Sequence, residues 1–481
     1  MRLWWQKNWH KLALISGALL LLFVATLSFL GWQIYRDSKE LLQNLKSPTQ
    51  IDAKITQSLN SDIDKLFSVL NLPLAGQVIK VLGLDFSPIK SEIQALISSS
   101  QTLAGDDGAK QYLVAFQNTA EARGTGGILG AYAIVELKKG SLKVIETGSN
   151  EPLYGSSLQK IPINVPDEYK RLYGENPAIL QNSNLSPHFP YGAEIWLALW
   201  KKEFGQTLDG VIAIDPTALS YILRSTGPIT LNSGEKITSE NLVADTLKNA
   251  YERYEKDNKA RKQYLVDIMN ATVMHLNSSD YSTLKMAQEI RDGIVANRIL
   301  FYSTDKSAQK KLSQTRLGGF MSLESNNEFR TVIQNIDAGK LDYYLDRDVT
   351  IESKSCEKLR ETQVRIRVTN TLKSATGLSS YVLTRADKGK PASLIAGSHR
   401  FKVFIYGPTD AKLVSVSREN RMANLGGGST ERDRPIYVAD VDLAPGASEE
   451  LRANFSGGVG KVTFVDQPLV METKINIKDR C

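Results

Sequence analysis

The sequence predicts a membrane-anchored, mixed α/β protein that ends in a β-rich domain, and three observations support this fold class. An uncharged apolar run lies close to the N-terminus, strands alternate with helices through the middle of the chain, and period-two strands separated by turns fill the rest. We therefore expect five segments: a cytoplasmic N-terminus over residues 1–11, a transmembrane helix over 12–32, a helical stalk and linker over 33–108, an extracytoplasmic α/β domain over 109–347 and a β-sandwich over 348–481.

The apolar run from Leu12 to Trp32 contains no charged residue. A helix needs ~20 such residues to cross a bilayer, and a backbone in hydrocarbon must satisfy its own hydrogen bonds. The alternative is a cleaved signal peptide, whose apolar region is usually ~7–15 residues long and ends in small residues. This run is longer and exits through Phe29–Gln33, which favours an uncleaved anchor. Arg2, Lys7 and Lys11 precede it, so the positive-inside rule predicts a single-pass protein of the cell membrane with its N-terminus in the cytoplasm.

The chain carries a formal net charge of +7, which suits an acidic partner. On an exported bacterial protein, anionic lipid, lipid pyrophosphate or wall polymer fits better than nucleic acid, because no nucleic-acid-binding motif occurs. The two cysteines, Cys356 and Cys481, could form a disulfide outside the cytoplasm or stay free. The sequence contains no CxxC or HExxH motif and its histidines are scattered, which argues against a zinc site.

The segment after the anchor has a helical pattern. Apolar residues recur at helical spacing, namely Ile55, Leu59, Ile63, Leu66, Phe67 and Leu70. Pro73 and Gly76 break the pattern, and a second helix over Ile89–Ile97 precedes a polar linker at 104–108. These helices form either a stalk that holds the main domain off the membrane or an amphipathic layer packed on that domain.

The α/β domain begins with a buried strand, Tyr112–Gln117, followed by a glycine-rich loop, Asn118–Gly127. Two strands joined by a Lys-Lys-Gly turn, Ile128–Leu137 and Ser141–Thr147, then form a hairpin. The later elements expected are a helix at Ala193–Glu203, a strand at Asp209–Ile214, a helix at Thr217–Arg224 capped by Asp215, an edge strand at Ile229–Leu231, one long helix from Ser239 to about Leu276, a helix at Tyr281–Ala296, a strand at Arg298–Ser303 and a helix at Lys306–Gln314.

The C-terminal part alternates apolar and polar residues, as where Val364, Ile366 and Val368 are separated by Arg365 and Arg367. Turn-forming clusters separate several such strands. This pattern indicates a β-sandwich of immunoglobulin-like type.

Three stretches carry a resemblance to a known family: YLVAFQNTAEARGTGGILGAYAIVELKKGSLKVIE, LDGVIAIDPTALSYILRSTGPITL and NIDAGKLDYYLDR. They occur in this order, and the chain resembles bacterial membrane-anchored proteins that share domain of unknown function 4012 (DUF4012). The resemblance implies an envelope location without implying a reaction. One position departs from the family pattern, because His188 stands where an acidic residue usually precedes Phe-Pro.

The order of elements also resembles, more loosely, the LytR-CpsA-Psr domain. Those enzymes are anchored by one N-terminal helix and transfer glycan phosphates from polyprenyl-pyrophosphate carriers onto peptidoglycan. The matching positions here are Gln117–Arg123, Leu208–Asp215 with Gly227, and Lys259–Gln263. This resemblance implies a glycopolymer phosphotransferase.

Glu121 and Arg123 are the candidate catalytic residues, since both lie just beyond a buried strand, where α/β sheets commonly bind ligands. An arginine fork can grip two phosphate oxygens, and a carboxylate can hold Mg²⁺ or position an acceptor hydroxyl. Gly126 and Gly127 would let backbone amides approach an anion. The alternative is that Glu121 and Arg123 pair with each other while the glycines only permit a tight turn.

Further candidate ligand-binding residues are Arg261, Lys262 and Arg224. A basic pair on a helix usually belongs to a solvated face, so Arg261 and Lys262 are candidates only because of the resemblance to the transferase domain. Arg224 either points at the site or interacts with the C-terminal end of its own helix.

The leading hypothesis is a membrane-anchored envelope protein that handles polyprenyl-linked glycan or wall polymer, as a phosphotransferase. The alternative is a non-catalytic scaffold that binds the polymer. The positions of three side chains can distinguish the enzyme from the scaffold. Convergence of Glu121, Arg123 and Arg261 on one cleft favours the enzyme, and wide separation favours the scaffold.

Overall fold

A computed structural model describes residues 61, 102–103, 105, 108–138, 141–157, 161–278, 281–355, 360–384, 395–419, 421–422 and 429–480. The predicted anchor, nearly all of the predicted stalk, and both cysteines lie outside these residues. Within them, no helix combines the length and the apolar character needed to span a membrane. The chain divides into two compact units, residues 1–110 with 137–142, and residues 111–136 with 143–481. Apart from Lys110 and residues 137–142, everything described below belongs to the second unit.

The α/β part is built on a five-stranded sheet in the order β3-β2-β1-β4-β7. Its strands are β1 (Lys110–Arg123), β2 (Gly126–Lys138), β3 (Ser141–Ser149), β4 (Gly210–Ile214) and β7 (Ile299–Ser303). Strand β4 lies parallel to β1 and antiparallel to β7. The alternating strands and helices predicted from the sequence therefore give a mixed sheet.

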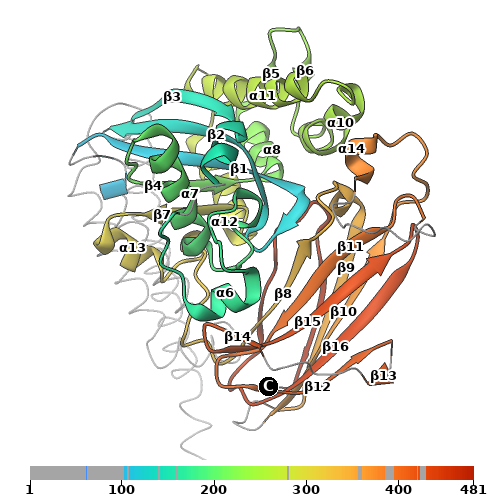
Figure 1. The fold of residues 1–481 in the computed structure, drawn as a ribbon. Coiled ribbons are helices and arrows are strands. Elements are labelled where there is room, and N and C mark those ends of the chain that lie inside the picture. The colour runs from blue at the N-terminus through green and yellow to red at the C-terminus, as the bar shows by residue number, and fades with distance from the viewer. Residues whose placement is uncertain are drawn as a thin grey trace, which may run out of the picture. The chain divides into compact units, whose positions relative to one another are not determined.

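Helices cover both faces of this sheet (Figure 1). Leu113 and Ala115 of β1 pack in one apolar core, whereas Val114 and Phe116 pack against another, as period-two alternation requires. The first core contains residues of α5 (Glu151–Ser157), α6 (Asp167–Tyr173), η1 (Leu180–Asn182) and α7 (Phe189–Phe204). The second contains residues of α8 (Pro216–Thr226), α9 (Leu242–Ala244), α10 (Ala250–Arg253), α11 (Asn258–Ser278), α12 (Thr283–Val295) and the small hairpin β5 (Ile229–Thr230) and β6 (Lys236–Ile237).

The predicted cap of α8 is confirmed. The Asp215 carboxylate accepts a hydrogen bond from the Ala218 amide at 2.8 Å, and Pro216 occupies the first helical position. The other Asp215 oxygen receives the Arg298 guanidinium at 2.6 Å. Both side chains are buried, so this ion pair joins α8 to the start of β7 inside the protein.

The glycine-rich loop predicted at 118–127 is wrong. Strand β1 continues to Arg123 and β2 begins at Gly126, so only two residues connect them. The side-chain amide of Asn184 holds this turn by donating to the Thr125 hydroxyl at 2.8 Å and to the Gly127 carbonyl at 2.9 Å. A Cβ on Gly127 would lie 2.2 Å from the Asn118 carbonyl, which shows why that position is glycine. The glycines serve close strand packing rather than an open loop.

The single long helix predicted from Ser239 to Leu276 is also wrong. The chain instead forms α9, a π-helical turn η2 (Asp245–Asn249) and α10, and then breaks before α11. Asp257 lies in the break, and its carboxylate accepts from the Ala260 amide at 2.9 Å, so it stabilises the start of a new helix. This interruption allows a side chain of α11 to contact a ring of α10.

Two sheets face each other in the C-terminal part and share one apolar core (Figure 1). One has the order β13-β12-β16-β10-β9-β18 and the other β14-β15-β11-β8-β17. Their strands are β8 (Glu328–Asn335), β9 (Leu345–Ser353), β10 (Glu361–Asn370), β11 (His399–Tyr406), β12 (Lys412–Arg418), β13 (Arg421–Met422), β14 (Ser429–Glu431), β15 (Arg434–Leu443), β16 (Ser448–Ser456), β17 (Thr463–Val465) and β18 (Lys474–Asp479). Strand β8 pairs with β11, so this part includes a strand that precedes the predicted boundary at 347.

A buried carboxyl links helix α6 to this β-rich part. Glu431, at the end of β14, accepts hydrogen bonds from the hydroxyls of Ser186 at 2.6 Å, Tyr173 at 2.7 Å and Tyr406 at 2.9 Å. Burial raises the pKa of Glu431, and these three hydroxyls only partly oppose that effect.

Candidate functional site

The two candidate catalytic residues lie at the end of β1 and bind each other. One Arg123 guanidinium nitrogen donates to the first Glu121 oxygen at 2.8 Å, and both side chains are almost fully buried. Three further Arg123 N–H groups donate to the carbonyls of Gln181 at 2.6 Å, Ala122 at 2.8 Å and Asn335 at 3.2 Å. Arg123 therefore joins β1 to η1 and β8. This arrangement agrees with the alternative that Glu121 and Arg123 pair with each other.

The second Glu121 oxygen is bound by the ammonium of Lys340. Lys340 directly precedes the short helix η4 (Leu341–Tyr344) and is itself buried. Burial alone would lower the pKa of Lys340, but the adjoining Glu121 carboxylate, together with Tyr251 and Tyr381, outweighs burial and raises it. Two residues further on, the Asp342 carboxylate accepts from the Ala122 amide at 3.1 Å, which fastens this segment to β1.

Arg261 reaches the same place from α11. Its guanidinium carbon lies 4.2 Å from the ring centroid of Tyr251, on α10, and 4.4 Å from that of Tyr381, on α14 (Ser380–Leu383). The Lys340 ammonium lies 6.0 and 5.5 Å from the same two centroids. Aromatic faces attract cations, so the two tyrosines hold both positive groups together. We call Glu121, Arg123, Tyr251, Arg261, Lys340 and Tyr381 the cation–tyrosine cluster.

The cluster contains more positive than negative charge. Arg123, Arg261 and Lys340 face a single carboxylate, Glu121, and all four side chains are buried. Arg261 also donates to the Asn258 side chain, which is neutral. A buried charge without a counter-ion is costly, so this arrangement suits an added anion. Tyr381 is 39% exposed, which brings the cluster to the molecular surface.

The remaining predicted site residues lie elsewhere. Lys262 pairs with Glu151 at 3.1 Å, beside the start of α5. Arg224 pairs with Glu289 at 3.3 Å and lies over the ring of Tyr221, at the end of α8. Neither of these contacts involves a member of the cluster.

Gly126 and Gly127 are buried at the start of β2 rather than in an open loop. No contact in the structure tests whether they bind a ligand. In the cluster, Glu121, Arg123 and Arg261 are linked indirectly, through Lys340 and Tyr251.

Sequence reasoning missed three members of the cluster. Lys340 lies in the stretch NIDAGKLDYYLDR, which was noted only as a family signature, although a lysine in such a stretch is a usable signal. Tyr251 belongs to an apolar helical stripe, and its hydroxyl accepts from the Asn118 amide at 2.5 Å. Tyr381 carries no sequence signal, because its position depends entirely on the tertiary fold.

Glu121 is poorly placed to hold a metal ion in this arrangement, because each of its oxygens is bound by a cation. Across the described residues, no group of three or more His, Cys, Asp or Glu side chains is gathered as a metal site would require.

His188, the departure from the family pattern, has a structural role. The residue is buried, and its Nδ1 accepts from the Met321 amide at 3.0 Å. Burial, together with nearby Arg432 and Arg330, lowers the pKa of His188, which keeps the ring neutral.

The fold and the cluster define an α/β protein whose central sheet carries a buried cationic cluster at one strand end. Residues 107–251 match the family model described as "Protein of unknown function (DUF4012)". The predicted resemblance to this family is confirmed over residues 107–251, which include the first two of the three stretches named above but not NIDAGKLDYYLDR. The segment includes Glu121, Arg123 and Tyr251 but ends before Arg261.

Two other comparisons add little. No curated protein matches the chain. A solved structure from Legionella pneumophila, described as a candidate nutrient binding protein, shares 9% sequence identity at a TM-score of 0.14. The alignment covers 28% of this chain and 43% of that one, so the chain spans less than half of that protein's length. This likeness carries no conclusion about fold or function.

Proposed function

We propose that the cation–tyrosine cluster binds the pyrophosphate of a polyprenyl-linked glycan, in an envelope protein anchored to the cell membrane by the run Leu12–Trp32. The observation that carries the proposal is the buried excess of positive charge at Arg261 and Lys340. Arg123 makes four hydrogen bonds to protein groups, whereas Arg261 makes one hydrogen bond to Asn258 and two contacts with aromatic faces. The guanidinium of Arg261 is therefore the group best suited to receive phosphate oxygens.

Binding accounts for the geometry better than catalysis. A general base or a metal ligand needs a carboxylate with a free oxygen, and both Glu121 oxygens are engaged by Arg123 and Lys340. The protein would thus hold a lipid-linked glycan or wall polymer without transferring it.

Glycan-phosphate transfer is the second candidate, and the convergence of Glu121, Arg123 and Arg261 favours it. Transfer from a polyprenyl-pyrophosphate carrier releases polyprenyl monophosphate. Release of that product by the wild type, lost in Glu121→Gln, would decide for the enzyme over the binding protein.

Binding is tested on the full-length protein in detergent micelles, with farnesyl pyrophosphate as the probe and farnesol as the uncharged control. Arg261→Ala should weaken farnesyl pyrophosphate binding about 10- to 100-fold, because a charge-assisted contact contributes ~1.5–3 kcal/mol. Arg261→Lys should recover part of the loss, since it restores the charge without the planar fork.

The matched control is Arg253→Ala. Arg253 is another arginine beside aromatic rings, lying 5.1 Å from the centroid of Tyr264 and paired with Glu235 at 2.7 Å. It belongs to none of the contacts of the cluster, so its loss should leave affinity unchanged. Equal affinity in wild type and Arg261→Ala, or equal losses in both alanine variants, would refute the proposal.

A further inference from the structure

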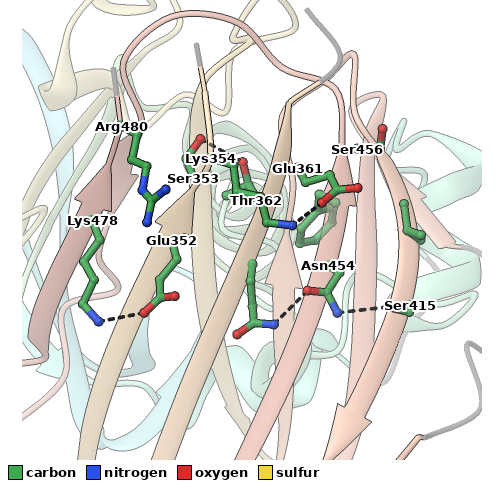
Figure 2. Close-up of a pocket in the computed structure, with 13 residues that line it drawn as sticks. Glu352, Ser353, Lys354, Glu361, Thr362, Ser415, Asn454, Ser456, Lys478 and Arg480 are labelled. Carbon is green, nitrogen blue, oxygen red and sulfur yellow. Dashed lines mark hydrogen bonds and ion pairs between the residues drawn. The ribbon is translucent and has the colours of Figure 1, made fainter. Parts of the chain in front are cut away.

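A polar groove lies on the outer face of the sheet that contains β9, β10 and β16. Its volume is about 670 Å³, within the ~300–1,000 Å³ range of ligand sites. Five strands supply its lining residues, as Figure 2 shows, and none of these belongs to the cation–tyrosine cluster. Of its lining side chains, Phe455 is aromatic but only 1% exposed, and Val414 is apolar and exposed, so recognition here relies mainly on hydrogen bonds and charge.

One register row crosses the groove. Directly opposed residues on the five neighbouring strands are, in order, Lys478, Glu352, Gln363, Asn454 and Ser415. The Gln363 amide donates to the Asn454 oxygen at 2.9 Å, and the Asn454 amide donates to the Ser415 hydroxyl at 2.9 Å (Figure 2). With strands ~4.8 Å apart, the row spans ~19 Å. Its neutral part, from Gln363 to Ser415, offers donors and acceptors over ~10 Å, and the paired Lys478 and Glu352 complete the row.

The charges around the row are unequal. Glu352 pairs with Lys478 at 2.7 Å and Glu361 with Lys354 at 2.5 Å (Figure 2). Arg480 also lines the groove and is exposed. Among the described residues, its guanidinium takes part in neither of these ion pairs. The groove therefore holds three cations, Lys354, Lys478 and Arg480, against two carboxylates, and Arg480 adds to Lys478 in lowering the pKa of Glu352.

An arginine group adjoins the row on the same face. Arg365 and Arg367 follow Gln363 at two-residue spacing along β10, which keeps all three side chains on one side of the sheet. The single carboxylate of Glu450 receives Arg365 at 3.5 Å, Arg367 at 3.1 Å and Arg452 at 2.5 Å. Despite partial burial, these arginines hold the pKa of Glu450 below its ordinary value. These three arginines share the Glu450 carboxylate, and Asp348 lies directly opposite Arg367 on β9, so the group has one more positive than negative charge.

We infer that this face binds an extended polysaccharide that bears carboxylate groups. The amide and hydroxyl row matches the many neutral hydroxyls of a sugar chain, and Arg480 with the arginine group matches its sparse carboxylates. A carboxylate already occupies the centre of the arginine group in the form of Glu450, which shows that these guanidinium groups can surround one. The inference does not rest on pyrophosphate binding at the cation–tyrosine cluster.

The test measures binding of polygalacturonate oligomers to the full-length protein in detergent micelles. The control ligand is the same oligomer with methyl-esterified carboxylates, which keeps the hydroxyls and removes the charge. The wild type should bind the free acid and lose most of that binding on esterification. Raising the salt concentration should weaken the binding, because exposed charges are screened.

Arg480→Ala and Arg365→Ala should each weaken binding about two- to fivefold, the size expected for exposed charge contacts. Gln363→Ala should weaken binding of both the free and the esterified oligomer, since it removes a neutral contact. The matched control is Arg291→Ala, an exposed arginine on α12 that pairs with Asp292.

Equal binding of the free and esterified oligomers by the wild type would overturn the inference. So would a loss in Arg291→Ala as large as that in Arg480→Ala, since binding would then follow net charge alone. Arg261→Ala should leave polygalacturonate binding intact, which separates this site from the proposed pyrophosphate site.

Discussion

Replacement of Arg123 by alanine should destabilise the protein strongly, in contrast to replacement of Arg261. Its guanidinium makes four hydrogen bonds, one to the Glu121 carboxylate and three to backbone carbonyls, and it is 4% exposed. The substitution leaves three buried acceptors without this donor and leaves Glu121 with Lys340 as its one cation. Breaking a buried ion pair costs ~3–5 kcal/mol, so we expect a loss of about 4 kcal/mol in the free energy of unfolding.

The assay is denaturant unfolding of the full-length protein in micelles, followed by tryptophan fluorescence. Trp196 and Trp200 lie in the apolar core between α7 and the sheet, and Trp196 donates to Ser183 at 2.7 Å, close to the Gln181 carbonyl that Arg123 binds. Their signal therefore reports unfolding of this region. Arg291→Ala serves as a control, because exposed substitutions usually change stability by less than ~0.5 kcal/mol.

One result would refute this reasoning. If Arg123→Ala unfolds at the wild-type denaturant concentration and yet loses farnesyl pyrophosphate binding, Arg123 faces the ligand, as its position first suggested. Arg123→Lys sharpens the comparison. A lysine keeps the charge beside Glu121 but cannot reach three carbonyls at once, so it should restore only part of the lost stability.

Two further predictions concern other buried acids. Glu431→Gln should remove a pH dependence of stability, because burial raises the Glu431 pKa and the folded state keeps a proton that the unfolded state loses above pH ~4.3. Wild-type stability should therefore fall relative to that of the variant as the pH rises from there. A constant difference between the two across a pH series of unfolding curves would contradict this. Asp215→Ala should lower the free energy of unfolding by about 4 kcal/mol, because it removes both the α8 cap and the partner of Arg298. Asp215→Asn should recover only ~1 kcal/mol of this loss, which is the contribution of the cap. Full recovery in the same unfolding assay would show that the ion pair contributes nothing.

Local sequence signals predicted the individual elements well. The strand at Asp209–Ile214 and the cap at Asp215 rest on neighbouring residues, and the structure has both nearly where expected. The glycine-rich segment led to the wrong prediction of a loop at 118–127, because glycine permits both an open loop and the close approach of two backbones. Only the contact between Gly127 and Asn118, set by strand pairing, distinguishes these cases.

The site was harder to predict than the fold because its members come from four separate regions of the chain. The helical stripe containing Tyr251 continues past residue 254, and nothing in its periodicity marks the break before Asn258. That break brings Arg261 onto the Tyr251 ring, and Lys340 and Tyr381 arrive from segments close to the β-rich part. Arg123 was the more conspicuous arginine in the sequence, yet four of its five N–H groups donate to three carbonyls and the Glu121 carboxylate, which only the folded chain brings together. The arginine best suited to bind a ligand is therefore Arg261, whose guanidinium makes only one hydrogen bond among the described residues.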